Sequence, residues 1–92
     1  KMAAIAEAAG VSVYIGGRPA TSIGSAAAAH FAAATWNATE GDYQCGSDGW
    51  LAADIVKNPL KVVDGHGIVP QDGPGIGVEL DEAALEKWGV RM

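Results

Sequence analysis

The chain has 92 residues, a single cysteine and a formal net charge of −5 at pH 7. An acidic chain repels phosphate backbones and anionic lipids, and no apolar run reaches the roughly 20 residues that span a bilayer, so nucleic acid and membranes are not expected partners. The lone Cys45 excludes a disulfide within the chain and suits a reducing, cytoplasmic setting.

The first expected elements are a helix and a strand. The stretch 2–9, MAAIAEAA, is rich in strong helix formers, and Gly10 follows it as a C-terminal stop. Residues 11–15, VSVYI, are β-branched and aromatic, which predicts a short strand.

A loop and a second helix follow that strand. The stretch 16–19, GGRP, is typical of a turn, and the alanine-rich stretch 22–35 predicts a helix that Thr21 or Ser22 can cap. Helix, strand, loop and helix in this order indicate a parallel α/β fold. A further buried strand is expected at 35–39.

The second half of the chain changes character, with frequent glycine and proline. Asp64-Gly65-His66 lies between two short β-type stretches and predicts a hairpin turn. Residues 78–80 are expected to be extended. A last helix is predicted over 82–88, with Asp81 as its cap and Gly89 as its stop.

The composition predicts that this chain needs more protein around it. Hydrophobic residues make up 49%, but many are alanines, and large core-building side chains are sparse. An alanine-rich helix buries little apolar area, and a domain of this size is marginally stable by itself. Because the chain starts with Lys1 rather than Met, we also expect a fragment or a processed chain.

The loop after the first strand is the most informative candidate site. In α/β folds ligands gather at the carboxyl ends of strands, and free N–H groups at a helix start attract anions. Gly16 and Gly17 allow close backbone approach, and Arg18 can hold a carboxylate through two parallel hydrogen bonds. The alternative is that the glycines serve the turn and Arg18 faces solvent.

Carboxylates follow the second expected strand. Asp42, and less strongly Glu40, can assist proton transfer or hydrogen-bond a substrate, unless they are solvated loop acids. The aspartates scattered over 42–54 do not form the compact set of oxygen ligands that a hard cation needs, so no metal site is predicted in this segment.

The two histidines are interpreted as structural. His30 lies among helical alanines and is expected to be buried and hydrogen-bonded. His66 falls in the predicted hairpin turn and is expected to be exposed. Neither has the spacing of zinc ligands.

Four stretches occur in a recognisable order. They are AAIAEAAG at 3–10, SIGSAAAAHFAAAT at 22–35, DIVKNP at 54–59 with VVDGHGIVP at 62–70, and DGPGIGVELDEAALEKWG at 72–89. The last contains the most specific motif, GPGIGVELD, and together they span nearly the whole chain. In this order they resemble the C-terminal region of the muconate lactonizing enzyme and mandelate racemase branch of the enolase superfamily.

The resemblance implies a fold and a chemistry. Residues 1–53 would be the C-terminal part of a modified (β/α) TIM barrel, its last two strands and helices, and 54–92 a tail that returns to the capping domain. The complete enzyme would remove a proton α to a carboxylate and form an enediolate that Mg²⁺ or Mn²⁺ stabilises, as in muconate cycloisomerases. The metal ligands and catalytic lysines of this branch lie on earlier strands, so this segment alone is expected to bind no metal and to be inactive.

The resemblance also implies partners and site residues. The partners would be the remainder of the enzyme chain, a small carboxylate substrate and further copies in a homo-oligomer. Asp42 would be catalytic, because racemases of this branch place a carboxylate at the end of the eighth strand. The expected substrate-binding residues are Gly17, Arg18, Ala20, Thr21 and Ser22.

One departure keeps several reactions open. Muconate-type members carry a glutamate in the loop after the seventh strand, where this chain has Ala20. Racemase, epimerase or acid-sugar dehydratase chemistry is therefore an alternative to cycloisomerisation. The alternative of another class is a non-catalytic module that binds anions or mediates interactions.

Overall fold

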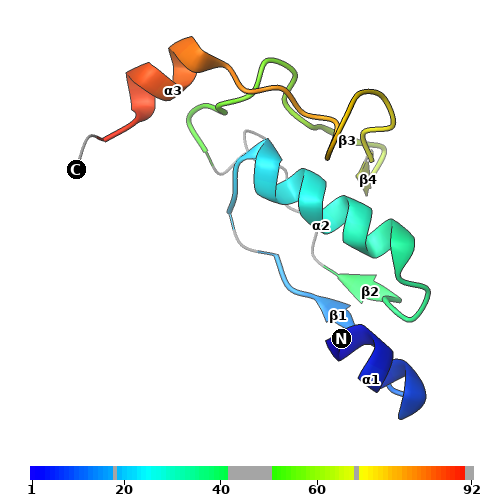
Figure 1. The fold of residues 1–92 in the computed structure, drawn as a ribbon. Helices are drawn as coiled ribbons and strands as arrows, with labels where there is room; N and C mark the ends of the chain where they lie inside the picture. The colour runs from blue at the N-terminus through cyan, green and yellow to red at the C-terminus, as the bar shows by residue number, and fades with distance from the viewer. Residues whose placement is uncertain (18, 42–50, 68, 91–92) are drawn as a thin grey trace.

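The computed structural model describes residues 1–17, 19–41, 51–67 and 69–90. The elements along these residues are α1 (Met2–Ala8), β1 (Tyr14–Ile15), α2 (Ser22–Ala34), β2 (Glu40–Gly41), β3 (Val62–Val63), β4 (His66–Gly67) and α3 (Glu82–Trp88). The fold is mixed α/β, with β1 and β2 paired in parallel and β3 and β4 paired antiparallel (Figure 1).

The amino-terminal half is a β-α-β unit. Tyr14 of β1 lies opposite Glu40 of β2, and Ile15 lies opposite Gly41. Parallel strands need a crossover connection, and α2 supplies it. The parallel α/β arrangement expected from the order of elements is thus confirmed for this unit.

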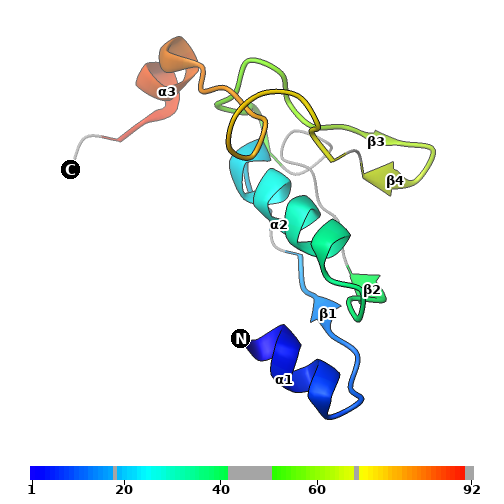
Figure 2. The same ribbon diagram turned by 45° about the vertical axis from the view of Figure 1, so that its right-hand side comes forward.

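The three predicted helices are confirmed to within one residue at each end. In α1, Gly10 follows the last turn with a φ of +68°, the left-handed conformation that glycine adopts most easily. In α3, the Asp81 side chain caps the first turn, accepting hydrogen bonds from the backbone N–H groups of Ala83 at 3.0 Å and Ala84 at 3.1 Å. In both ribbon views α3 projects away from the rest of the molecule (Figures 1 and 2).

The strand expected at 35–39 is wrong. The chain leaves α2 at Thr35, turns at Trp36 and Asn37, and becomes a strand only at Glu40. The helix α2 continues to Ala34, and the Ala38 N–H then donates to the Thr35 carbonyl at 3.0 Å, which closes a turn over these residues. The first strand is likewise shorter than 11–15, because only its last two residues pair with β2.

Asn37 also connects α1 to the end of α2. It is 5% exposed, and its side-chain Nδ2 donates to the carbonyls of Ala3 and Val11, each at 3.3 Å. A buried amide is costly without such partners. The two bonds therefore fix the position of α1 against the turn that precedes β2.

The tail runs along the side of α2 that faces away from β1 and β2 (Figures 1 and 2). Val56 forms an antiparallel bridge with Leu80, and the Lys57 N–H donates to the Glu79 carbonyl at 2.9 Å. The predicted extended piece at 78–80 is therefore confirmed at Leu80.

An exposed ion pair supports the same bridge. The Lys57 ammonium donates a hydrogen bond to the Glu79 carboxylate, which together with the charge attraction raises the pKa of Lys57 above its ordinary value. Because the pKa is raised, any stabilisation is complete at neutral pH and disappears as the pH rises through the folded-state pKa. Exposed pairs of this kind contribute little.

The hairpin turn is one residue shorter than expected. Asp64 and Gly65 have φ values of +51° and +76°, which suit a two-residue turn of the primed type. His66 consequently belongs to β4 and lies opposite Val63, rather than in the turn. It is exposed, as predicted, and its ring Nδ1 donates to the Asp64 carbonyl at 2.9 Å.

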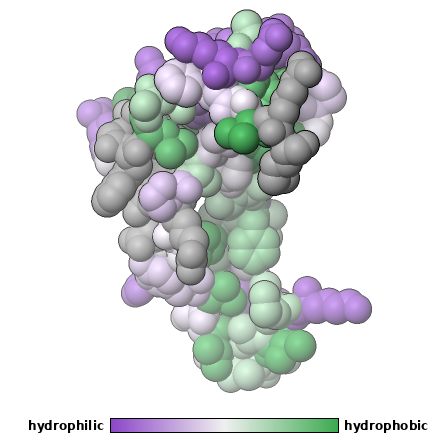
Figure 3. Space-filling view, turned by 90° about the vertical axis from the view of Figure 1, so that its left-hand side faces the viewer, coloured by the Kyte–Doolittle hydropathy of each residue, from purple (hydrophilic) through white to green (hydrophobic). Residues whose placement is uncertain are grey.

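The described residues bury little apolar surface. Their buried hydrophobic side chains are Ala26, Ala29 and Val56. Large apolar side chains remain more than half exposed at Met2, Ile5, Val11, Tyr14, Val63, Trp36, Trp88 and Val90. Figure 3 shows apolar surface gathered at the lower end of the molecule, where α1 lies.

We predict that residues 1–92 alone do not unfold cooperatively, because so small a buried core does not offset the conformational entropy of ordering the chain. Circular dichroism should show helical signal that fades gradually on heating, with little near-ultraviolet signal from the tryptophans. A sharp, concentration-independent transition would contradict this prediction.

Two glycines of the tail provide a matched pair. Gly77 has a φ of +72°, and a Cβ there would lie 2.6 Å from the Pro70 Cβ. Gly75 has a similar φ of +66°, but a Cβ there meets open space. The two positions therefore differ in crowding and not in backbone conformation.

In a longer chain that contains this segment and unfolds cooperatively, Gly75→Ala should cost about 1–2 kcal/mol through left-handed backbone strain. Gly77→Ala should cost about 1–3 kcal/mol more, because the methyl group also collides with Pro70. Urea unfolding measures the free energy of unfolding of both variants. Equal decreases in Gly75→Ala and Gly77→Ala would show that the crowding at Gly77 does not affect stability.

Candidate functional site

The candidate site is the loop 16–21, at the carboxyl end of β1 and immediately before α2. Of the expected substrate-binding residues, Gly17, Ala20 and Thr21 are partly exposed in this loop. Arg18 lies outside the described residues, as does Asp42, the expected catalytic residue.

The predicted cap of α2 by its own residues is replaced by a carboxylate from the tail. Thr21 occupies the capping position, but its side chain accepts no hydrogen bond from the described N–H groups of the helix start. Instead, the Ser22 N–H donates to both carboxylate oxygens of Asp54, at 3.1 and 3.0 Å. A negative charge at a helix start is favourable, because the N–H groups there carry partial positive charge.

The Ser22 hydroxyl extends this link. Its Oγ donates to Asp54 Oδ2 at 2.6 Å and accepts a hydrogen bond from the Leu60 N–H at 2.9 Å. The Ile55 N–H donates to the other oxygen of Asp54 at 2.8 Å. One carboxylate and one hydroxyl thus join the start of α2 to two points of the tail.

This network changes the interpretation of Ser22. Its side chain is 0% exposed, and its N–H and hydroxyl are both engaged by Asp54. The expectation that Ser22 contacts substrate has no support in this arrangement. The start of α2 was predicted to attract an anionic ligand, but the Asp54 carboxylate of the same chain already occupies it.

The loop also packs on the first turn of α2. A Cβ built at Gly24 would lie 3.1 Å from the Cβ of Ala20, which is tighter than ordinary contact. The missing side chain at Gly24 therefore makes room for Ala20. Loop and helix start are in close contact at this point.

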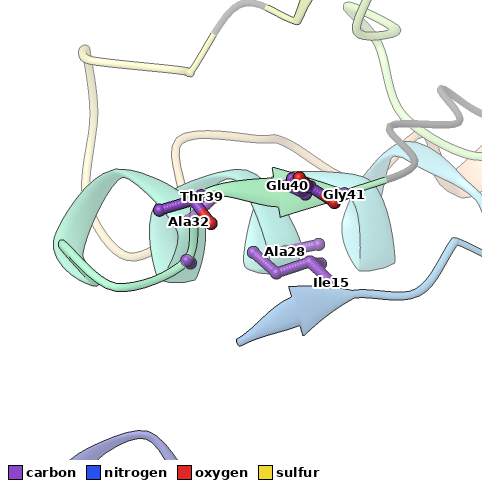
Figure 4. Close-up of a pocket in the computed structure, with 7 residues that line it drawn as sticks. Ile15, Ala28, Ala32, Thr39, Glu40 and Gly41 are labelled. Carbon is purple, nitrogen blue, oxygen red and sulfur yellow. The ribbon is translucent and has the colours of Figure 1, made fainter. Parts of the chain in front are cut away.

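A small cavity lies on the α2 side of the parallel strands. Its volume is about 240 Å³, and its lining residues are Ile15, Ala28, Ala32, Ala38, Thr39, Glu40 and Gly41. Figure 4 shows Ile15 of β1 and Ala28 of α2 facing one another across it. The lining is mainly apolar, with Glu40 as its charged member, so the cavity suits an apolar side chain better than a carboxylate.

His30 holds the tail against the middle of α2. Its Nε2 lies 3.1 Å from the Ile76 carbonyl, so the ring carries its proton on Nε2 and donates it. The side chain is hydrogen-bonded, as expected, but it is only partly buried rather than buried.

Among the described residues, no group of three or more His, Cys, Asp or Glu side chains is arranged to hold a metal ion. The divalent ion implied by the sequence resemblance therefore does not fit a site made of these residues alone. No helix within the described ranges is both long and apolar enough to cross a membrane.

Comparisons with known proteins identify the family. Residues 1–84 match the family model described as Enolase C-terminal domain-like, so the chain belongs to this family. Muconate cycloisomerase 1 from Rhodococcus opacus is 33% identical over 88 residues, and chloromuconate cycloisomerase from Pseudomonas putida is 39% identical over 90. Each alignment covers 96% of this chain and 23% of the relative.

Solved structures agree with the sequence matches. Muconate lactonizing enzyme from Klebsiella pneumoniae superposes with a TM-score of 0.84 and 33% identity, over 98% of this chain and 25% of that one. The 2-chloromuconate cycloisomerase from Rhodococcus opacus 1CP gives a TM-score of 0.74, also at 33% identity, over 98% of this chain and 24% of that one. The chain thus spans about a quarter of the length of these relatives.

Sequence reasoning missed the role of Asp54. It stands in the stretch DIVKNP, which contributed to the family resemblance, but nothing near it in sequence indicates which helix it caps. Its partner lies 32 residues earlier.

Proposed function

We propose that residues 1–92 act as the C-terminal part of a longer enolase-superfamily enzyme that cycloisomerises muconate-type dicarboxylates. The observation that carries this proposal is the superposition on muconate lactonizing enzyme, with a TM-score of 0.84 over 98% of the chain. The curated relatives reported above are named for the same chemistry, on muconate or chloromuconate.

In this proposal β1, α2 and β2 belong to the last part of a (β/α) barrel within residues 1–53. The exposed apolar side chains of α1 and the strands would then pack against earlier parts of the chain. Residues 54–92 would return to a capping domain, and α3 would dock there. The complete enzyme would be cytoplasmic and form a homo-oligomer.

The loop 16–21 would form part of the pocket wall in the complete enzyme. Gly17, Ala20 and Thr21 would shape the wall, and Arg18 would bind a substrate carboxylate in two-point fashion. Asp42 would move a proton at the carbon next to a carboxylate. Magnesium or manganese, held by residues outside this segment, would supply electrophilic stabilisation when bound.

A second candidate function rests on Ala20. The sequence resemblance implies a glutamate at this position in muconate-type members, and the methyl group of Ala20 offers no carboxylate. Racemisation, epimerisation or dehydration of another carboxylate by the same barrel is the reaction class that this difference favours. A non-catalytic anion-binding module is less well supported, because Asp54 fills the helix start on which that alternative depended.

The full-length protein, supplied with magnesium or manganese, should consume cis,cis-muconate or 2-chloromuconate at about 1–10³ turnovers per second. Cyclisation to a lactone removes the conjugation between the double bonds, so ultraviolet absorbance falls, and NMR identifies the product. A racemase or epimerase would instead exchange an α-proton of another carboxylate with deuterated solvent. If neither lactone formation nor exchange occurs, the proposed function is wrong.

Asp42→Asn in the full-length protein should lower kcat by at least about 10²-fold, because the amide does not take up a proton. Glu7→Gln is the control, since it removes a charge from an exposed side chain of α1, away from loop 16–21, and should leave kcat nearly unchanged. Steady-state kinetics on both variants decides the matter. Wild-type turnover in Asp42→Asn would leave Asp42 as a loop acid.

A further inference from the structure

Asp54 contacts the end of loop 16–21, which the proposed function places in the pocket wall. Its carboxylate binds the N–H and the hydroxyl of Ser22, the residue that ends this loop and begins α2. Because Ser22 is fully buried, its polar groups depend on partners within the protein. Asp54 is the partner for both donors of Ser22.

The loop 16–21 is fixed at its two ends by different contacts. At its start, Ile15 pairs with Gly41 across the parallel strands. At its end, the Thr21–Ser22 junction is fixed by Asp54, and the Ser22 Oγ is further fixed by the Leu60 N–H. The second attachment comes from the tail and not from the β-α-β unit itself.

Contact between the loop and the first helical turn transmits this attachment. A Cβ built at Gly24 would lie 3.1 Å from the Ala20 Cβ, so Ala20 packs closely on the first turn of α2. A continuous set of contacts therefore connects Asp54 with Ala20 through Ser22 and the first turn of α2. Asp54 lies in the tail, and the partners recorded for its carboxylate belong to Ser22 and Ile55.

We propose that Asp54 is a positioning residue, which sets the place of loop 16–21 and thereby the shape of the pocket for a carboxylate substrate. This inference rests on the proposed function for its consequence in catalysis. The structural part of the inference, that Asp54 orders the loop, is independent of the proposed function. Asp54 also occupies the anion-attracting start of α2, so a substrate carboxylate must be bound by other groups.

The test compares Asp54→Asn with Asn37→Ala in the full-length protein. Asp54→Asn keeps the shape of the side chain and one acceptor oxygen but has no second acceptor for the Ser22 hydroxyl. Asn37→Ala removes two hydrogen bonds at the other end of β1, away from the loop, and is the matched control for lost stability. Ser22→Ala, which keeps the backbone bond to Asp54, is the milder variant if Asp54→Asn does not fold.

Two readouts are needed. Hydrogen exchange of the amides of 16–22, measured without substrate, should become faster in Asp54→Asn and stay unchanged in Asn37→Ala. With substrate, Asp54→Asn should lower kcat/KM by about 10- to 100-fold, mainly by raising KM, because a displaced wall weakens substrate and transition-state binding alike. Asn37→Ala should lower the melting temperature and leave KM unchanged.

The inference is overturned if loop exchange in Asp54→Asn matches that of the unsubstituted protein, or if both variants raise KM equally. An unsubstituted protein that transforms no carboxylate refutes the proposed function instead. In that case the exchange measurement alone decides whether Asp54 orders the loop. The two failures are therefore distinguishable.

Discussion

The contact between the Asp54 carboxylate and the start of α2 is the constraint on which the arrangement of this segment depends. It joins residues 32 positions apart and attaches the tail to the β-α-β unit. Two further polar contacts repeat the pattern along α2. His30 attaches Ile76 at the middle of the helix, and Asn37 attaches α1 just beyond its end. Hydrogen bonds thus attach two parts of the tail to α2 and attach α1 to the turn that follows it.

This design differs from a domain held together by its own apolar core. The buried hydrophobic side chains among the described residues are two alanines and a valine, whereas many larger ones are exposed. A hydrogen bond contributes modest net stability but fixes distance and direction closely. The segment therefore has a well-defined internal geometry without much independent stability. Both properties suit a piece that is completed by packing against the rest of a larger enzyme of its family.

Helix positions followed from sequence because their determinants are local. Gly10 and the Asp81 cap act within a few residues of the helices they delimit. No strand forms at 35–39, because α2 continues to Ala34 and a turn closed by the Ala38 N–H and the Thr35 carbonyl follows it. The side-chain partners of Asn37 in this turn are the carbonyls of Ala3 and Val11, which local sequence pattern does not indicate. The candidate site likewise has a part that local sequence predicted and a part that it did not. The loop after β1 was found from the order of elements, but the true cap of α2 comes from Asp54, far along the chain.

The position of Asp54 has a consequence for how the molecule is made. Synthesis proceeds from the amino terminus, so the start of α2 emerges from the ribosome 32 residues before the carboxylate that caps it. Until then water accepts the hydrogen bonds of the N–H groups at the start of α2, and a helix end without a cap frays. The cap of α2 therefore forms only after the strand and the helix that border the loop have both been translated.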